Sequence, residues 1–168
     1  MQHYGNNPDN EGNAPQYTPY MSQDPYGYNN GLSVALQLIR DALSGETEDR
    51  MFYEYLISIA PSEEEKRIIE SIRDDEMRHY SMFRQLYYEL TGQMPTIAQE
   101  PTFEKPASYC DGIKRALFGE QNAVRKYRRI LFALQDRRQI NMLTEIITDE
   151  IRHGILYSYI YSKNGCDV

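Results

Sequence analysis

Apolar residues recur at helical spacing through most of the chain. In the clearest stretch, seven positions are separated alternately by three and four residues, which places their side chains on one face of a helix. These positions are Ile69, Ile72, Glu76, His79, Phe83, Leu86 and Leu90. Ser62 and Glu65 form a capping-box pattern at the start, and Thr91-Gly92 marks the end. The pattern predicts a helix over about residues 63–91.

Three further helices are predicted on the same grounds. One spans residues 32–60, another runs from about Pro106 to Leu134, and the last runs from about Arg137 to Ser162 with Asp136 as its cap. Two connections are short, whereas the Pro- and Thr-rich connection between the second and third helices is long enough to cross a bundle. This connectivity predicts an all-α, ferritin-like four-helix bundle made of two hairpins, 32–91 and 106–162.

The two hairpins are copies of each other. When the chain is aligned with itself at an offset of 74 residues, segment 39–56 falls on 113–130 and segment 72–79 falls on 146–153. Identical residues meet at eleven positions of the first copy, which are Ile39, Ala42, Leu43, Gly45, Glu46, Tyr53, Ile72, Asp75, Glu76, Arg78 and His79. The repeat therefore preserves polar residues as well as the core.

The repeated polar residues are predicted to meet inside the bundle. Each hairpin has one Glu on its first helix and a Glu-x-x-His pair on its second, at equal distances from the turn. Antiparallel packing would bring these positions level, so four Glu and two His would share one buried layer. The six residues are Glu46, Glu76, His79, Glu120, Glu150 and His153.

Such a layer needs compensating positive charge. Four carboxylates in a dry interior repel one another and lose hydration worth several kcal/mol each. Arg50 is the one nearby cation in the pattern, and Val124 stands at its place in the second copy. Two divalent metal ions would balance the four carboxylates, and this donor set suits iron, manganese or zinc.

Residues 39–161 resemble the rubrerythrin-like branch of the ferritin-like superfamily. The resemblance rests on Gly-Glu followed by Tyr seven residues later, and on Asp-Glu-x-x-His, each present twice. It implies that the six residues bind two iron or manganese ions, with Glu76 and Glu150 as bridging carboxylates. It also implies an oxidoreductase that acts on peroxide or dioxygen, for which the four Glu, Tyr53 and Tyr127 are the candidate catalytic residues.

The chain departs from the family pattern in two respects. It has two Cys, whereas a rubredoxin-type domain needs four, so no such domain is expected. Electrons would then come from an external donor, or the reaction would be a dismutation that needs no electron donor. Only six residues follow the fourth predicted helix, which disfavours a ferritin-like storage shell. Two alternatives stay open: a structural or spore-coat-associated protein without turnover, and a ferroxidase that handles iron.

Residues beside the candidate ligands suggest supporting roles. Asp75 and Asp149 precede the Glu of each pair, and each is expected to accept the free ring N–H of the His on the other hairpin. Asp49 is a weaker candidate for an extra carboxylate, because Ala123 replaces it in the second copy. Arg78 and Arg152 lie off the ligand face and are expected to be solvated.

Composition limits the remaining possibilities. Residues 1–31 are rich in Tyr, Asn, Gly and Pro and read as a disordered tail, whereas residues 32–168 form the folded domain. The net charge of −7 disfavours nucleic-acid binding, and neither a secretory leader nor a membrane span is evident. Cys110 and Cys166 are too few and too far apart to predict a disulfide framework. We therefore expect a cytoplasmic protein, with the spore coat as the alternative location. The resemblance to the ferritin-like bundles further implies a homodimer.

Overall fold

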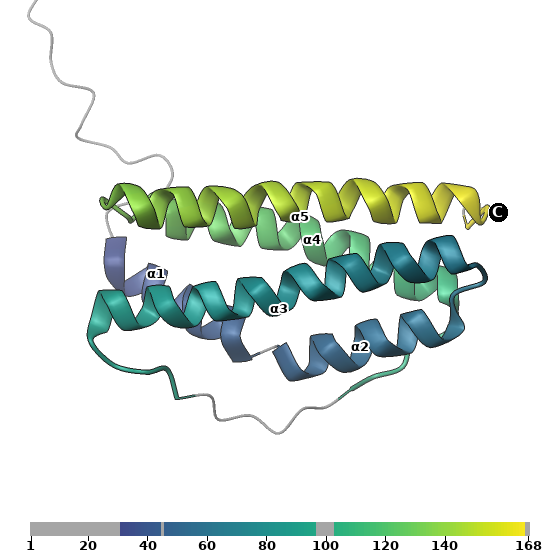
Figure 1. The fold of residues 1–168 in the computed structure, drawn as a ribbon, viewed down its shortest axis with the longest axis horizontal. Coiled ribbons are helices and arrows are strands. Elements are labelled where there is room, and N and C mark those ends of the chain that lie inside the picture. Colours follow the sequence, from purple (N-terminus) through teal and green to yellow (C-terminus); the bar gives the residue numbers. More distant parts are fainter. Residues whose placement is uncertain (1–30, 45, 97–102, 167–168) are drawn as a thin grey trace, which may run out of the picture.

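The fold is a bundle of helices that lie along one long axis (Figure 1). A computed structural model describes residues 31–44, 46–96 and 103–166, with the side chains of residues 46–48 outside the description. Within these ranges the helices are α1 (Gly31–Ser44), α2 (Glu46–Ile59), α3 (Glu63–Thr91), α4 (Tyr109–Leu131) and α5 (Arg137–Lys163). This part of the chain contains no strand, so the all-α prediction is confirmed. None of its helices is apolar over a length sufficient to cross a bilayer.

The first predicted helix, residues 32–60, corresponds to α1 and α2, which together cover Gly31–Ser44 and Glu46–Ile59. Gly45 lies outside the described residues, so the continuity of the helix at this position stays a prediction. Segment α1 lies against both α3 and α4, while α2 lies mainly on α3. The predicted tail, apart from Gly31, lies outside the described residues.

The other helix ends follow local capping chemistry. Ser62 Oγ accepts a hydrogen bond from the Glu65 backbone N–H, and Gly92 closes α3 in the left-handed conformation with φ of 70°. The predicted bounds of α3 are therefore confirmed. The start of α4 is three residues later than predicted because Ser108, rather than the segment at Pro106, provides the cap. Asp136 caps α5 as expected.

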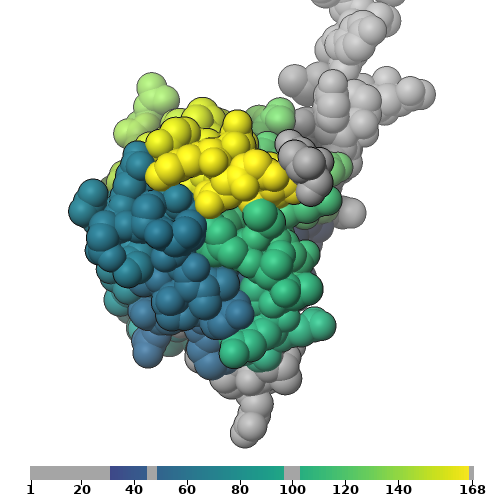
Figure 2. Space-filling model, turned by 90° about the vertical axis from the view of Figure 1, so that its right-hand side faces the viewer, coloured from purple at the N-terminus to yellow at the C-terminus, as the bar shows by residue number. Residues whose placement is uncertain are grey.

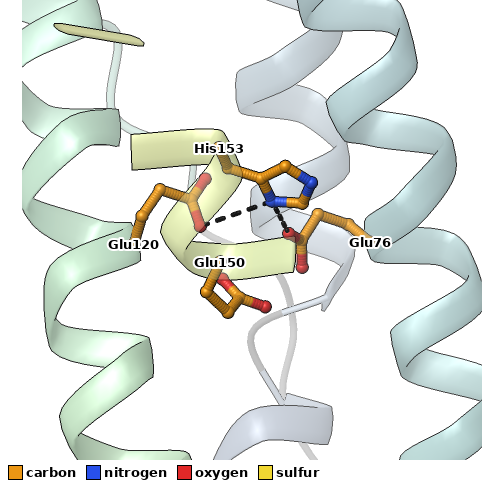
Figure 3. Close-up of side chains that lie close together, drawn as sticks. All are labelled: Glu76, Glu120, Glu150 and His153. Atoms are coloured by element: carbon orange, nitrogen blue, oxygen red, sulfur yellow. Dashed lines mark ion pairs between the residues drawn. The ribbon is translucent and has the colours of Figure 1, made fainter. Parts of the chain in front are cut away.

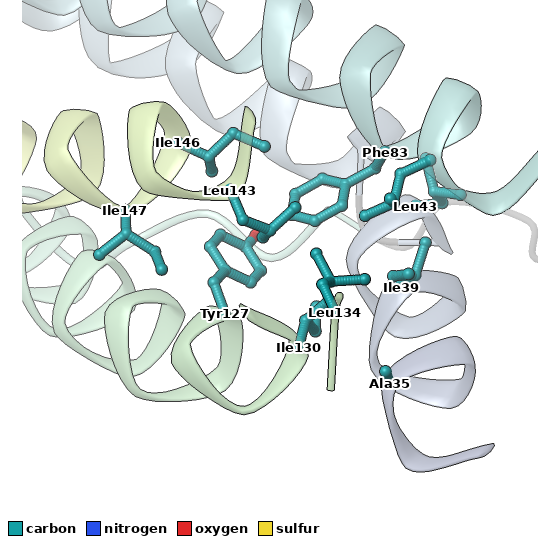
Figure 4. Close-up of a cluster of buried hydrophobic side chains, with 11 residues drawn as sticks. Ala35, Ile39, Leu43, Phe83, Tyr127, Ile130, Leu134, Leu143, Ile146 and Ile147 are labelled. Carbon is teal, nitrogen blue, oxygen red and sulfur yellow. The ribbon is translucent and has the colours of Figure 1, made fainter. Parts of the chain in front are cut away.

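The interior consists of two apolar clusters separated along the bundle axis. One cluster gathers residues from α1 and from the parts of α3, α4 and α5 beside it, with Ile39, Phe83, Tyr127 and Ile146 among its members (Figure 4). The second gathers residues from α2 and the opposite ends of α3, α4 and α5. On every long helix the candidate ligands fall between the residues of the two clusters. The fold thus places a polar layer between two apolar clusters.

One end of the bundle carries a disulfide that the sequence analysis did not anticipate. Cys110 and Cys166 are 56 residues apart in sequence, but their Cα atoms are 5.4 Å apart and the sulfurs are bonded. Because α4 and α5 are antiparallel, the start of one lies beside the end of the other (Figure 2). At the same end the buried Glu65 carboxylate accepts hydrogen bonds from Tyr109 and Asn164. Sequence separation was therefore a poor guide to this pair.

Candidate metal centre

The polar layer is built from three long helices. Glu76 and His79 come from α3, Glu120 from α4, and Glu150 and His153 from α5. Within each Glu-x-x-His pair the two residues are three positions apart, so their side chains lie on the same face of the helix. His79, Glu120, Glu150 and His153 are each 4% exposed or less, and Glu76 is partly buried. The structure therefore brings together five of the six residues predicted from the repeat.

Each imidazole faces one carboxylate of the other hairpin and one of its own. The Nδ1 atom of His153 lies 3.1 Å from Glu76 Oε1 and 3.7 Å from Glu120 Oε2 (Figure 3). The Nδ1 atom of His79 lies 3.1 Å from Glu150 Oε1 and 3.6 Å from Glu76 Oε2. The two oxygens of Glu76 thus face the two different His residues. One atom from each of Glu76, Glu120, Glu150 and His153 lies within 4.8 Å of the others.

The side chain of Glu46 lies outside the described residues. Its backbone begins α2, which runs beside α3. Its role as the sixth ligand stays a prediction from the repeat, in which Glu46 is the counterpart of Glu120.

The outer nitrogen of each imidazole contacts an aspartate from the opposite hairpin. Asp149 Oδ2 lies 3.1 Å from His79 Nε2, and Asp75 Oδ2 lies 3.2 Å from His153 Nε2. The crossed contact expected from the sequence is confirmed. When Nε2–H donates to Asp, the Nδ1 lone pair of a neutral imidazole points into the layer.

Two arginines bind these aspartates, which the sequence analysis did not anticipate. Arg78 and Arg152 were expected to be solvated, and they are indeed about half exposed. Their guanidinium groups nevertheless bind the aspartates: Arg78 contacts Asp75 and Asp149 at 2.8 Å each, and Arg152 pairs with Asp75. Long side chains on an outer helix face can reach a neighbouring helix, which spacing along one helix does not reveal. The result is a closed set of ion pairs between α3 and α5.

The donor atoms of the layer fit a pair of metal ions. Glu76 Oε1, Glu150 Oε1 and the Nδ1 atoms of both His are buried and make no hydrogen bond within the described residues. Unpaired buried polar atoms are costly, yet here they converge in facing pairs about 3.1 Å apart. Carboxylate oxygens and imidazole nitrogens in this arrangement suit divalent iron, manganese or zinc. The residues present therefore fit the group that the sequence implied.

Without metal, protons balance the layer. Burial raises the pKa of the Glu120 carboxyl to about 8. Burial, with the charge of Glu76, raises the pKa of Glu150 well above its usual range. Burial alone would lower the pKa of His79, but the Glu150 and Glu76 carboxylates outweigh it and raise that pKa to about 10. The layer thus favours bound positive charge.

Three buried tyrosines flank the layer. Tyr53 and Tyr127, both predicted candidates, are 8% exposed, and burial with nearby carboxylates raises the pKa of each hydroxyl well above its usual range. Tyr157 is a third tyrosine beside the layer, which the sequence analysis did not single out. It is fully buried, its hydroxyl makes no hydrogen bond within the described residues, and it follows His153 by one helical turn. Extending the ligand face by four residues would have identified it.

Two cavities reach the layer from either side of α2. A small one of about 40 Å³ lies between α2 and α3 and is lined by Asp49, Arg50 and His79. A larger one of about 390 Å³ lies between α2 and α4, and Glu76, Glu120 and Glu150 are part of its lining. Asp49 lines both cavities and so lies beside the layer, as its spacing from Glu46 suggested. The candidate centre is therefore accessible to small molecules.

Comparisons with known proteins found a matching family and a relative. The family description Rubrerythrin matches residues 37–161. The uncharacterized protein YhjR from Bacillus subtilis is 30% identical over 126 residues, which span 75% of this chain and 86% of YhjR.

Two solved structures share the fold. A hypothetical protein from Pyrococcus furiosus superposes with a TM-score of 0.66 at 19% identity, covering 76% of this chain and 88% of that one. A conserved hypothetical protein from Mycobacterium tuberculosis gives 0.66 at 12% identity, covering 77% and 92%. At such identities the likeness concerns the fold alone, and it confirms the ferritin-like bundle.

Proposed function

Because this chain belongs to the rubrerythrin family, we propose that it is a dimetal oxidoreductase that acts on peroxide or dioxygen. The observation that carries the proposal is the buried layer in which two Glu-x-x-His pairs face each other, with carboxylate oxygens and imidazole nitrogens that make no hydrogen bond within the described part of the chain. Two iron ions, or alternatively manganese, would supply redox chemistry toward an oxygen species when bound.

The residues of the layer divide into bridging and terminal ligands. Glu76 is the best candidate for a bridge, because its two oxygens face different His residues at 3.1 and 3.6 Å. Glu150 takes the equivalent place in the repeat. Glu120 and Glu46 would each serve one ion, as would His79 and His153.

Residues outside the layer orient and protect the ligands. Asp75 and Asp149 accept the Nε2–H of the two His and so direct Nδ1 inward. Tyr53 and Tyr127 keep their hydroxyl protons at neutral pH, because their pKa values are raised by burial. They are hydrogen-bond donors available to an oxygen species that enters through the adjoining cavities. Electrons would come from an external donor unless the reaction is a dismutation.

Metal analysis of freshly purified protein tests the proposal. We expect two transition-metal ions per chain and rapid loss of added peroxide by the reduced protein. A protein that holds no transition metal, in preparations never exposed to chelators, would instead favour a structural or coat-associated role. Accumulation of mineralised iron would favour a ferroxidase.

Substitutions distinguish the proposed metal ligands from residues that bind no metal. Glu76→Ala or Glu150→Ala should abolish binding of two metals, because each removes a carboxylate that faces the His residues. Arg67→Ala, at an exposed position of α3, is the matched control and should keep full stoichiometry. Retention of two metals by both Glu variants would contradict the ligand assignment. A homodimeric state and a location in the cytoplasm or spore coat remain proposals from the sequence.

A further inference from the structure

Arg78 and Arg152 are the repeated polar residues to which the proposed function gives no role. They occupy the same position in the two hairpins, one residue before each His of the layer. Their side chains are 48% and 47% exposed, and an isolated ion pair at such a position contributes little to stability. The reason for two arginines at this level must therefore be sought in the groups that they contact.

Each guanidinium contacts both aspartates of the layer. Arg78 Nη1 lies 2.8 Å from Asp75 Oδ1, and Arg78 Nη2 lies 2.8 Å from Asp149 Oδ2. Arg152 pairs with Asp75 through Nη2, and its Nε lies 3.7 Å from Asp149 Oδ1. A further carboxylate, that of Glu145, lies 3.7 Å from Arg78 Nε. The two arginines and two aspartates thus form one cluster across α3 and α5, in which neither arginine belongs to one aspartate alone.

The two aspartates depend on this positive charge because they lie close together. Asp75 and Asp149 both have an oxygen 2.8 Å from the same guanidinium, so their carboxylates are neighbours. They are 13% and 18% exposed, and water therefore screens their mutual repulsion only in part. Without the arginines the carboxylates would move apart. Each movement would take an acceptor away from the Nε2–H of an imidazole.

We propose that Arg78 and Arg152 are positioning residues that act through the aspartates on both imidazoles at once. Each guanidinium holds the two carboxylates that accept the Nε2–H of the two His, so each arginine supports a ligand of both metal ions. The proposal deepens the proposed function and rests on it for the presence of the metals. It adds a physical link between the two metal positions.

The sign of the effect on metal binding separates this role from direct electrostatics. A guanidinium close to the centre repels metal cations, so by charge alone its removal would strengthen metal binding. Loss of positioning has the opposite sign, because an imidazole that has lost its outer partner binds metal more weakly. Weaker binding after removal of an arginine therefore indicates positioning.

Stepwise binding of Co²⁺ to the full chain, measured by competition with a chelator, tests the proposal. We expect Arg78→Gln and Arg152→Gln each to weaken binding of both ions about tenfold, and the double variant to weaken it about 100-fold. The visible absorption of bound Co²⁺ should change as well, because it depends on the geometry of the ligands.

Arg138→Gln is the matched control. Arg138 also joins α5 to α3, through an ion pair of 2.8 Å with Glu89. It precedes Glu150 by about 18 Å along the helix and contacts no aspartate of the layer. Its removal should leave both Co²⁺ affinities and the absorption spectrum unchanged.

A second set of variants tests whether the arginines act through the aspartates. In Asp75→Asn/Asp149→Asn the carboxylates are absent, so adding Arg78→Gln should weaken Co²⁺ binding no further. Arg78→Lys keeps the charge but loses the fork that contacts two carboxylates at once, and should recover only part of the affinity. An arginine that merely stabilised the helices would have the same effect with the aspartates present or absent.

Two results would overturn the proposal. One is a double arginine variant that binds both ions as tightly as the original protein or more tightly. The other is an Arg78→Gln effect that persists in full when the aspartates are absent. Thermal melting checks the fold of each variant, and the single arginine variants decide the question if the double variant does not fold.

The same measurements separate this proposal from the proposed function. Two bound Co²⁺ with unchanged affinity in the arginine variants would refute only the positioning role. An original protein that binds no Co²⁺ would refute the dimetal centre, and the positioning role with it.

Discussion

Removing the Cys110–Cys166 disulfide should lower the free energy of unfolding substantially. The bridge closes 56 residues of sequence and joins the start of α4 to the end of α5. In the chain-entropy treatment, a crosslink of that span removes enough freedom from the unfolded chain to stabilise the fold by about 4 kcal/mol at 25 °C. The hydrogen bonds of Glu65 to Tyr109 and Asn164 hold the same end together, so the reduced protein should remain folded.

Urea unfolding of the oxidised protein, the reduced protein and the Cys110→Ser/Cys166→Ser variant measures the effect. We expect the last two to coincide and to lie below the oxidised protein by about 4 kcal/mol. Reductant should leave the double variant unchanged, which controls for its other effects. Metal stoichiometry should be equal in all three, because Cys110 precedes Glu120 by ten residues, about 15 Å along α4. Equal stability of oxidised and reduced protein would refute the structural role of the bridge.

Three further predictions concern the polar layer. Asp149→Asn should weaken metal affinity about 10- to 100-fold, because the Asp149 carboxylate orients His79. Asp74→Asn, at an exposed position of the same sequence repeat, should leave the affinity unchanged. Competition with a chelator measures the metal affinity of both variants. Stability of the metal-free protein should fall as pH rises from about 4.5 to 8, because native Glu120 holds a proton that the unfolded chain has released, and further toward pH 10 for the same reason at His79; urea unfolding at several pH values should show no such fall with metal bound. Tyr157→Phe should raise the free energy of unfolding of the metal-free protein by about 1 kcal/mol, because it removes a buried hydroxyl that makes no hydrogen bond to any described residue; a lower stability would show that the hydroxyl has a partner.

The repeat allowed the architecture and most of the site to be predicted. The bounds of α3 and the cap of α5 follow from residues close in sequence, such as Ser62, Gly92 and Asp136. The meeting of Glu76, His79 and their copies follows because two equal hairpins align their marked positions. Each of these inferences needs only helix geometry and the period of the pattern.

What could not be predicted depends on contacts between distant segments. The pairing of Cys110 with Cys166 depends on two helix ends that meet only in the folded bundle. The ion pairs of Arg78 and Arg152 depend on the reach of long side chains between α3 and α5. Neither of these has a periodic signature in one segment of sequence.

The two halves differ where the centre opens, although they agree within it. At the offset of 74 residues the ligands, the aspartates and the arginines of the layer are the same in both copies. Other aligned positions differ: Lys126 corresponds to Phe52, Ala123 to Asp49 and Tyr157 to Phe83. The first two of these pairs line the larger cavity, on both of its walls. The first two differences therefore lie on the α2–α4 side, whereas the layer itself keeps in both copies the donor set that two like ions would require.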